Sequence, residues 1–152
     1  MTALALEDVH TYYGEAHILQ GVSLVVNPGE VVTLIGRNGA GKTTTLRSIM
    51  GIARPRRGRV RLGGEDLTRL RTHEIARRGI AYIPEERRVL PNLTVLENLR
   101  LGLLGAGANG GAPAAARIER ALDLFPRLRE RIGHKGRFLS GGEQQMLAIA
   151  RG

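Results

Sequence analysis

The sequence contains no cysteine and no tryptophan, and only three of its 152 residues are aspartate. The lack of cysteine excludes disulfides and thiolate metal sites, and it fits a reducing compartment. No apolar run is long enough to cross a bilayer, and the first ten residues lack the basic flank of a secretory signal. The apolar content of 42% is ordinary for a globular protein, so a folded domain with a real core is expected.

Lysine is scarce as well, since only Lys42 and Lys135 are lysines and all other basic residues are arginines spread along the chain. The net charge is +9, which in other proteins indicates nucleic acid or an anionic membrane surface. An arginine bias without clustering favours codon composition over a binding face, so no nucleic acid is expected. The densest run, residues 54–61, is interpreted as solvated surface, with an anion-binding patch as the alternative.

Short apolar segments predict strands along the first half of the chain. Residues 3–9 and 22–26 are expected to form strands, and 58–67 a hairpin. The continuous apolar runs 30–35 and 80–83 are typical of strands that are buried on both faces of a parallel sheet. Strands that alternate with helices favour a parallel α/β core.

Helix signals follow each of the later strands. Helices are predicted at 45–51, ending at Gly51, and at 72–79. Thr94 and Glu97 have the spacing of a capping box, which predicts that a helix starts there. A further helix is expected from Pro113 onward, because apolar residues recur at helical spacing after it.

The stretch "GRNGAGKTT" (36–44) has the spacing of a phosphate-binding loop, with Gly36, Gly41, Lys42 and Thr43 at the required positions. Glycines allow successive N–H groups to face one anion, and the following helix start adds partial positive charge. Lys42 could reach β- and γ-phosphates, and the Thr43 hydroxyl could bind Mg²⁺. The alternative is a glycine-rich turn with an incidental lysine.

A second glycine turn, "LSGGEQQ" (139–145), places Ser140 as a helix N-cap ahead of Gly141 and Gly142. One nucleotide needs only one phosphate loop. This turn is therefore either an ordinary cap or a ligand of a nucleotide that another molecule holds.

Together the two stretches resemble the nucleotide-binding domain of ABC transporters: 36–44 resembles the Walker A loop and 139–145 the signature motif. The resemblance implies a P-loop NTPase (RecA-like) α/β core with an N-terminal antiparallel β subdomain and a helical subdomain. It also implies ATP and Mg²⁺, and a dimer in which each signature turn completes the partner's site. The residues it assigns to the nucleotide are Tyr13 (stacking on adenine), Gly36, Asn38, Gly39, Ala40, Gly41, Lys42, Thr43 and Thr44, with Ser140, Gly141 and Gly142 acting in trans.

Glu85 stands where most members of this family have the glutamine of the Q-loop. The surrounding segment 82–99 resembles the importers of branched-chain amino acids and amides. The resemblance assigns Glu85 a catalytic role beside Lys42, and it assigns the metal to Thr43 and Glu85, since carboxylates are hard oxygen ligands. The alternative for Glu85 is a solvated loop acid.

The family also has an apolar strand that ends in Asp, then a catalytic Glu, then a His. Asp8, Asp66 and Asp123 are the only aspartates, and none ends such a strand. The resemblance therefore implies a fragment of the domain, truncated after the signature motif and inactive alone. Its expected parts are a β subdomain with the Walker A core (about 1–90), a helical subdomain (about 91–140) and the signature turn and helix (139–152).

For the parent protein, the resemblance implies an ATPase subunit peripheral to the cytoplasmic face of the inner membrane. Its expected partners are a second ABC ATPase subunit and transmembrane permease subunits. The alternatives are a soluble ABC ATPase without a transport role and a catalytically incomplete nucleotide-binding fragment.

Overall fold

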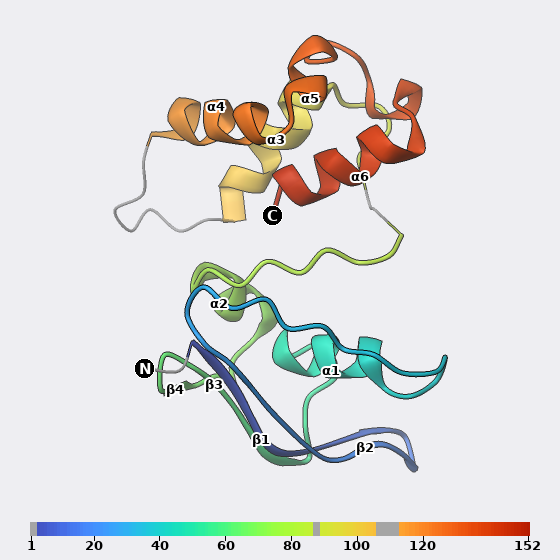
Figure 1. Ribbon diagram of the computed structural model, residues 1–152, viewed down its shortest axis with the longest axis vertical. Coiled ribbons are helices and arrows are strands. Elements are labelled where there is room, and N and C mark those ends of the chain that lie inside the picture. Colours follow the sequence, from blue (N-terminus) through green and yellow to red (C-terminus); the bar gives the residue numbers. More distant parts are fainter. Residues whose placement is uncertain (1–2, 87–88, 106–112) are drawn as a thin grey trace. The chain divides into compact units, whose positions relative to one another are not determined.

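The computed structural model describes residues 3–86, 89–105 and 113–152. The chain divides into two units, Met1–Ile80 and Ala81–Gly152. The first unit is built on a β-sheet and the second on a group of helices (Figure 1).

The sheet of the first unit contains four strands in the order β2-β1-β3-β4, and each neighbouring pair is antiparallel. The predictions of strands at 3–9 and 22–26 and of a hairpin at 58–67 are confirmed. The strands are longer than predicted at the first two places, because β1 and β2 continue into a hairpin. Their bounds are β1 Leu4–Tyr13, β2 Ala16–Val26, β3 Arg57–Leu62 and β4 Glu65–Asp66.

A bulge interrupts β1 at Asp8, whose φ of 47° lies in the left-handed region that non-glycine residues rarely adopt. Glycines on the two neighbouring strands, Gly21 on β2 and Gly58 on β3, leave space for Asp8. A Cβ on Gly58 would lie 2.1 Å from the Asp8 carbonyl oxygen, and one on Gly21 would lie 2.9 Å from the Asp8 Oδ1. The bulge shifts the alternation of β1, so that Leu6 is buried before it and Val9 after it.

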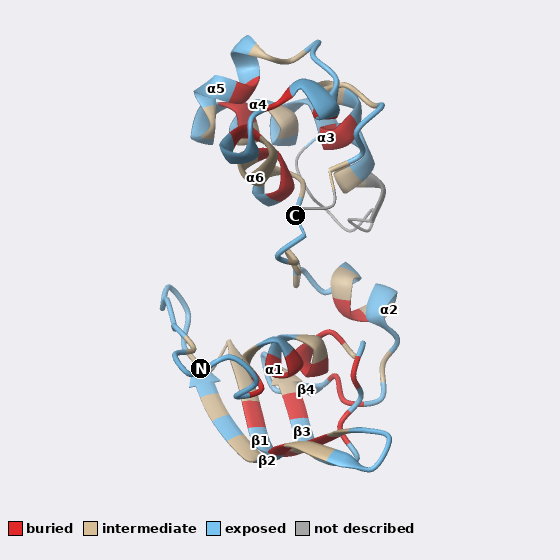
Figure 2. Ribbon diagram, turned by 90° about the vertical axis from the view of Figure 1, so that its right-hand side faces the viewer, coloured by how far each residue is buried: buried red, intermediate tan, exposed pale blue. Residues whose placement is uncertain are grey.

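Helix α1 (Lys42–Ile49) packs on one face of this sheet, and Figure 2 shows buried positions on α1 and on the strands. A buried hydrogen bond of 2.8 Å joins Thr11 Oγ1 of β1 to Ser48 Oγ of α1. Helix α2 (Thr72–Arg77) follows β4 and buries Ile75. The contacts of α1 with β1 and β2 place the N-terminus of α1 beside the β1–β2 hairpin.

The second unit packs its helices around one apolar core. The helices are α3 (Val95–Gly105), α4 (Ala114–Leu124), α5 (Pro126–Glu130) and α6 (Gly141–Ala150). Burial of each Leu or Val side chain contributes about 1.5–3 kcal/mol. The core side chains are Val95, Leu99, Leu122, Leu128, Leu139 and Leu147. Among the described residues, no helix is both long and apolar enough to cross a membrane.

The helix predictions are confirmed, and at the start of α3 the predicted capping is present. Thr94 N–H donates to Glu97 Oε2 (2.7 Å) and Glu97 N–H donates to Thr94 Oγ1 (3.2 Å), so the predicted capping box starts α3. Pro113 is the N-cap of α4. Helix α1 starts three residues earlier than predicted and is followed by Gly51 at φ 66°.

The predictions of strands at 30–35 and 80–83 are wrong, because neither segment is a strand in the structure. The side chains of Val31 and Ile35 are each 92% exposed. A strand with apolar residues on both faces forms only where strands on either side complete its hydrogen bonds. In the part of the chain that the structure describes, no named strand pairs with either segment.

Candidate nucleotide-binding site

The Walker A loop lies on the surface of the first unit, immediately before α1. Residues Gly36 to Ala40 are all exposed, and Ala40 N–H donates to the Arg37 carbonyl at 3.1 Å. Lys42 Nζ donates to the carbonyls of Gly36 (2.6 Å) and Arg37 (2.9 Å). The Lys42 ammonium therefore contacts the backbone at the start of the Walker A loop.

Two glycines give this loop its shape. Gly39 and Gly41 have φ of 85° and 91°, where a side chain would strain the backbone. A Cβ on Gly41 would also lie 2.7 Å from Leu19 Cδ2 of β2. Gly41 thus allows α1 to begin in contact with the β1–β2 hairpin.

The N-terminus of α1 has the features of an anion site. Its N-cap is Gly41, which makes no side-chain capping bond, and the first turn contains no acidic residue. The first N–H groups of a helix lack partners within the helix and carry partial positive charge. A phosphate group would complement both.

The three threonines that follow Lys42 differ in exposure. Thr43 is exposed, whereas Thr44 and Thr45 are buried, and the role of Thr43 as a metal ligand stays a prediction. The Thr45 hydroxyl donates to the Gly41 carbonyl at 3.0 Å and supports the start of the helix. Among the described residues, no group of three or more His, Cys, Asp or Glu side chains could hold a metal.

Tyr13 ends β1 beside the turn of the hairpin, and it is 44% exposed. Side chains alternate along a strand, so Tyr13 shares a face with Thr11, which bonds to α1. The ring is therefore exposed on the α1 face of the strand, and its stacking on adenine stays a prediction.

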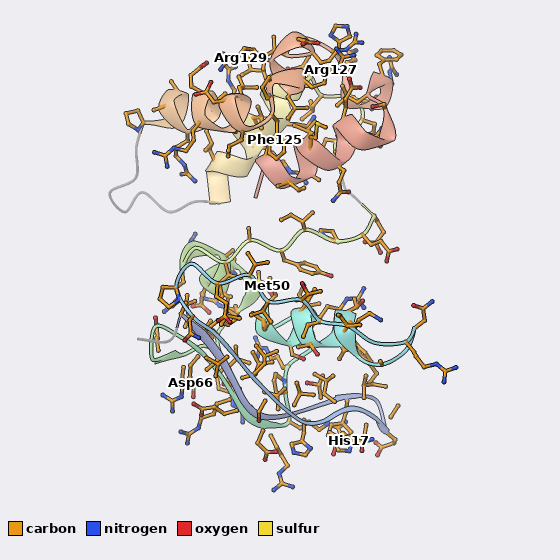
Figure 3. The ribbon with its side chains drawn as sticks, viewed as in Figure 1. His17, Met50, Asp66, Phe125, Arg127 and Arg129 are labelled. Atoms are coloured by element: carbon orange, nitrogen blue, oxygen red, sulfur yellow. The ribbon has the colours of Figure 1, made fainter. Side chains whose placement is uncertain are left out.

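The signature turn caps α6 in the second unit. Ser140 Oγ accepts from Glu143 N–H (3.3 Å), and Glu143 Oε2 accepts from Ser140 N–H (2.8 Å). Arg127 Nε contacts Glu143 Oε1 at 3.1 Å, and Figure 3 labels Arg127 on α5. The bond from Ser140 N–H, followed by those from the Ser140 hydroxyl and from Arg127, lowers the pKa of Glu143 against the opposing effect of burial. Gly141 and Gly142 are exposed on the first turn.

Asn98 is a residue of this unit to which sequence reasoning gave no role. Its side chain is fully buried, and its Nδ2 donates to the carbonyls of Leu90, Leu93 and Thr94 at 3.0–3.2 Å. Its Oδ1 accepts from Leu90 N–H at 3.0 Å. The segment that Asn98 holds bonds in turn to the residues before the signature turn, since Gly136 N–H donates to the Leu93 carbonyl. The sequence signal for a role of Asn98 is a single asparagine within the apolar pattern of a predicted helix.

Glu85 is exposed and lies in a turn of the second unit, whereas Lys42 and Thr43 belong to the first. The next two residues, 87 and 88, lie outside the described part of the chain. The roles assigned to Glu85, in catalysis and as a metal ligand, therefore stay predictions.

A family model described as ABC transporter matches residues 19–152, which include both glycine turns. The chain belongs to the ABC transporter family. The high-affinity branched-chain amino acid transport ATP-binding protein BraG of Pseudomonas aeruginosa is 45% identical over 148 residues, 97% of this chain and 62% of that protein. The lipopolysaccharide export system ATP-binding protein LptB of Haemophilus influenzae is 37% identical over 155 residues, 99% of this chain and 62% of that protein.

A solved ABC structure is similar along nearly the whole chain. It is the dimeric post-hydrolysis state of an ATP-binding cassette bound to ADP and Pi, at 30% identity, with a TM-score of 0.81 over 97% of this chain and 68% of that chain. The P-loop NTPase fold implied by the resemblance is thereby confirmed. The chain spans about three-fifths of the length of the curated relatives it matches. The expected division into a β subdomain with the Walker A core, a helical subdomain and a signature part remains a prediction.

Proposed function

We propose that this chain is the ATP-binding part of an ABC importer subunit, which couples ATP binding and hydrolysis to uptake of branched-chain amino acids or related amides. The observation that carries the proposal is an exposed Walker A loop on the uncapped start of α1, in a chain 45% identical to BraG. The parent protein would act at the cytoplasmic face of the inner membrane, peripheral to it, with permease subunits and a second ABC ATPase subunit as partners.

In this proposal the backbone N–H groups from Gly36 to Thr44 hold the phosphates of ATP. Lys42 exchanges its contacts with loop carbonyls for contacts with β- and γ-phosphate oxygens. The Tyr13 ring stacks on adenine. The Thr43 hydroxyl and Glu85, directly or through water, serve Mg²⁺, which neutralises phosphate charge when it is bound.

Ser140, Gly141 and Gly142 are proposed to contact the γ-phosphate of ATP held by a partner subunit. An exposed glycine pair at the start of α6 supports this role, because a neighbouring molecule can approach its N–H groups closely. ATP binding would close such a dimer, and hydrolysis would reopen it.

The test of nucleotide binding uses the only two lysines. Lys42→Ala removes the ammonium that meets the phosphates, so the ATP affinity of the full-length protein is expected to fall at least about tenfold. Lys135→Ala is the matched control, because it removes the same charge from an exposed position in the other unit. Calorimetric titration with Mg²⁺-ATP measures both. Equal affinity in the Lys42→Ala variant and the unmutated protein would refute the assignment.

A second candidate is an ABC ATPase with a different task, because LptB is also a relative at 37% identity. Deletion of the gene and measurement of leucine, isoleucine, valine and amide uptake separates the two. Unchanged uptake of all these solutes would exclude the importer and favour the second candidate. Residues 1–152 by themselves are proposed to bind nucleotide without sustained hydrolysis, since none of the three aspartates follows an apolar strand.

A further inference from the structure

Arg56 connects two parts of the β1–β2 hairpin, although it lies in the segment before β3. Its guanidinium carbon is 4.5 Å from the centre of the Tyr12 ring, within the range of a cation–π contact. Its Nη2 donates to the Gly14 carbonyl at 2.7 Å. Its own N–H donates to the His10 carbonyl at 2.8 Å. One arginine thus contacts the residues on both sides of Tyr13.

Tyr12 is held from a second direction by His17. The two rings are parallel within 6°, with centroids 4.1 Å apart. His17 Nε2 is 3.0 Å from His10 Nδ1, and His10 Nε2 is 3.1 Å from Asp8 Oδ1. Figure 3 shows His17 at the hairpin end of the sheet. The chain of contacts thus ends at Asp8, the residue of the β1 bulge.

Tyr13 itself lies on the opposite face from this cluster. Tyr12 and His10 share one face of β1, whereas Tyr13 and Thr11 share the face that α1 covers. Gly14 follows at φ 57°, in a conformation that other residues rarely adopt. Because Arg56 contacts both Tyr12 and Gly14, the backbone between them has little freedom, and the direction of the Tyr13 ring depends on it.

We propose that Arg56 is a positioning residue for the base-binding ring, so that it raises the affinity for ATP through the adenine and not through the phosphates. The inference rests on the proposed binding of ATP at the Walker A loop. The proposal gives one arginine of the basic segment 54–61 a specific role. The interpretation of that segment as solvated surface did not distinguish among its arginines.

The experiment separates the base from the phosphates. The full-length protein and its Arg56→Ala variant are titrated with Mg²⁺-ATP and with inorganic tripolyphosphate, which carries the phosphates without the base. Arg56→Ala is expected to weaken ATP binding about fivefold and to leave tripolyphosphate binding unchanged. Arg54→Ala is the matched control, since it removes an exposed arginine two residues away, and it should change neither affinity.

Two conservative variants test the route of the effect. Arg56→Lys keeps a cation for the Tyr12 ring and a donor for the Gly14 carbonyl, and it should recover part of the ATP affinity. Tyr12→Phe keeps the aromatic ring and should bind ATP like the unmutated protein. A structural role of Arg56 would weaken both ligands together and would lower the melting temperature, and that result overturns the proposal.

The failures are distinguishable. An unmutated protein that binds neither ATP nor tripolyphosphate contradicts the proposed function itself. Normal ATP binding by Arg56→Ala contradicts only the positioning role. An equal loss of ATP affinity in Arg54→Ala and Arg56→Ala also contradicts it, because general charge would then explain the effect.

Discussion

Replacement of Asn98 by alanine tests how the segment before the signature turn is held. The Asn98 side chain makes four hydrogen bonds to the backbone of Leu90, Leu93 and Thr94, and none of its area is exposed. Alanine removes all four bonds and leaves buried N–H and C=O groups without that partner. The shortened side chain also leaves a small cavity.

The two N–H groups of the amide share three carbonyls, so the four contacts amount to about three full bonds of about 1 kcal/mol each, and with the cavity Asn98→Ala is expected to lower the free energy of unfolding by about 3–5 kcal/mol. Such a loss is large beside the 5–15 kcal/mol that stabilises a typical domain, as an order of magnitude. Urea unfolding of the full-length protein measures it. Asn92→Ala, an exposed asparagine in the same segment, should change stability by less than about 0.5 kcal/mol. A loss below about 1 kcal/mol for Asn98→Ala would refute the clamp.

Gly142→Asp should leave ATP binding by a single subunit intact but block ATP-driven dimer closure, because it places a negative charge beside the γ-phosphate of the ATP that the partner subunit holds. Sedimentation of a hydrolysis-blocked full-length protein with ATP measures dimer closure. Persistent ATP-dependent dimers of the Gly142→Asp variant would contradict the trans role. Glu143 has a lowered pKa in the folded state, so its contribution to stability is present above its ordinary value of 4.5 and is lost as the pH falls through the lowered value. The stability difference between the unmutated protein and Glu143→Gln, measured by urea unfolding, should therefore shrink as the pH falls below 4.5; a difference independent of pH would show that the cap does not depend on the charge.

The features that could be predicted from the sequence are those that neighbouring residues determine. The capping boxes at Thr94 and Ser140 need only residues three positions apart. The Walker A loop likewise joins a turn to the helix that follows it. Its predicted contacts with ATP remain predictions, but the exposure and left-handed glycines that such contacts require are present.

The features that could not be predicted depend on residues distant in sequence. The apolar pattern of 30–35 indicates what a strand would bury, but hydrogen-bonding neighbours decide whether a strand forms. Arg56 is a contact of the same kind. It reaches a turn 42 residues away, and nothing in "RPRRGRVR" distinguishes it from the arginines beside it. Its role follows from topology, which local patterns do not contain.

The two glycine turns differ in their capping, and the difference bears on how each would bind phosphate. Helix α1 starts without a side-chain cap and without an acid in its first turn, so nothing in that turn opposes the attraction of its N–H groups for an anion. Helix α6 has Glu143 in its first turn, and that carboxylate opposes an anion there. Ser140 Oγ accepts a bond from Glu143 N–H, and its hydroxyl also bonds to the Glu143 carboxylate, so the donors left for an approaching molecule are the first N–H groups of the helix, at Gly141 and Gly142. A turn with weak intrinsic attraction but correctly directed donors binds phosphate well only when another site already holds it, as the proposed trans arrangement requires.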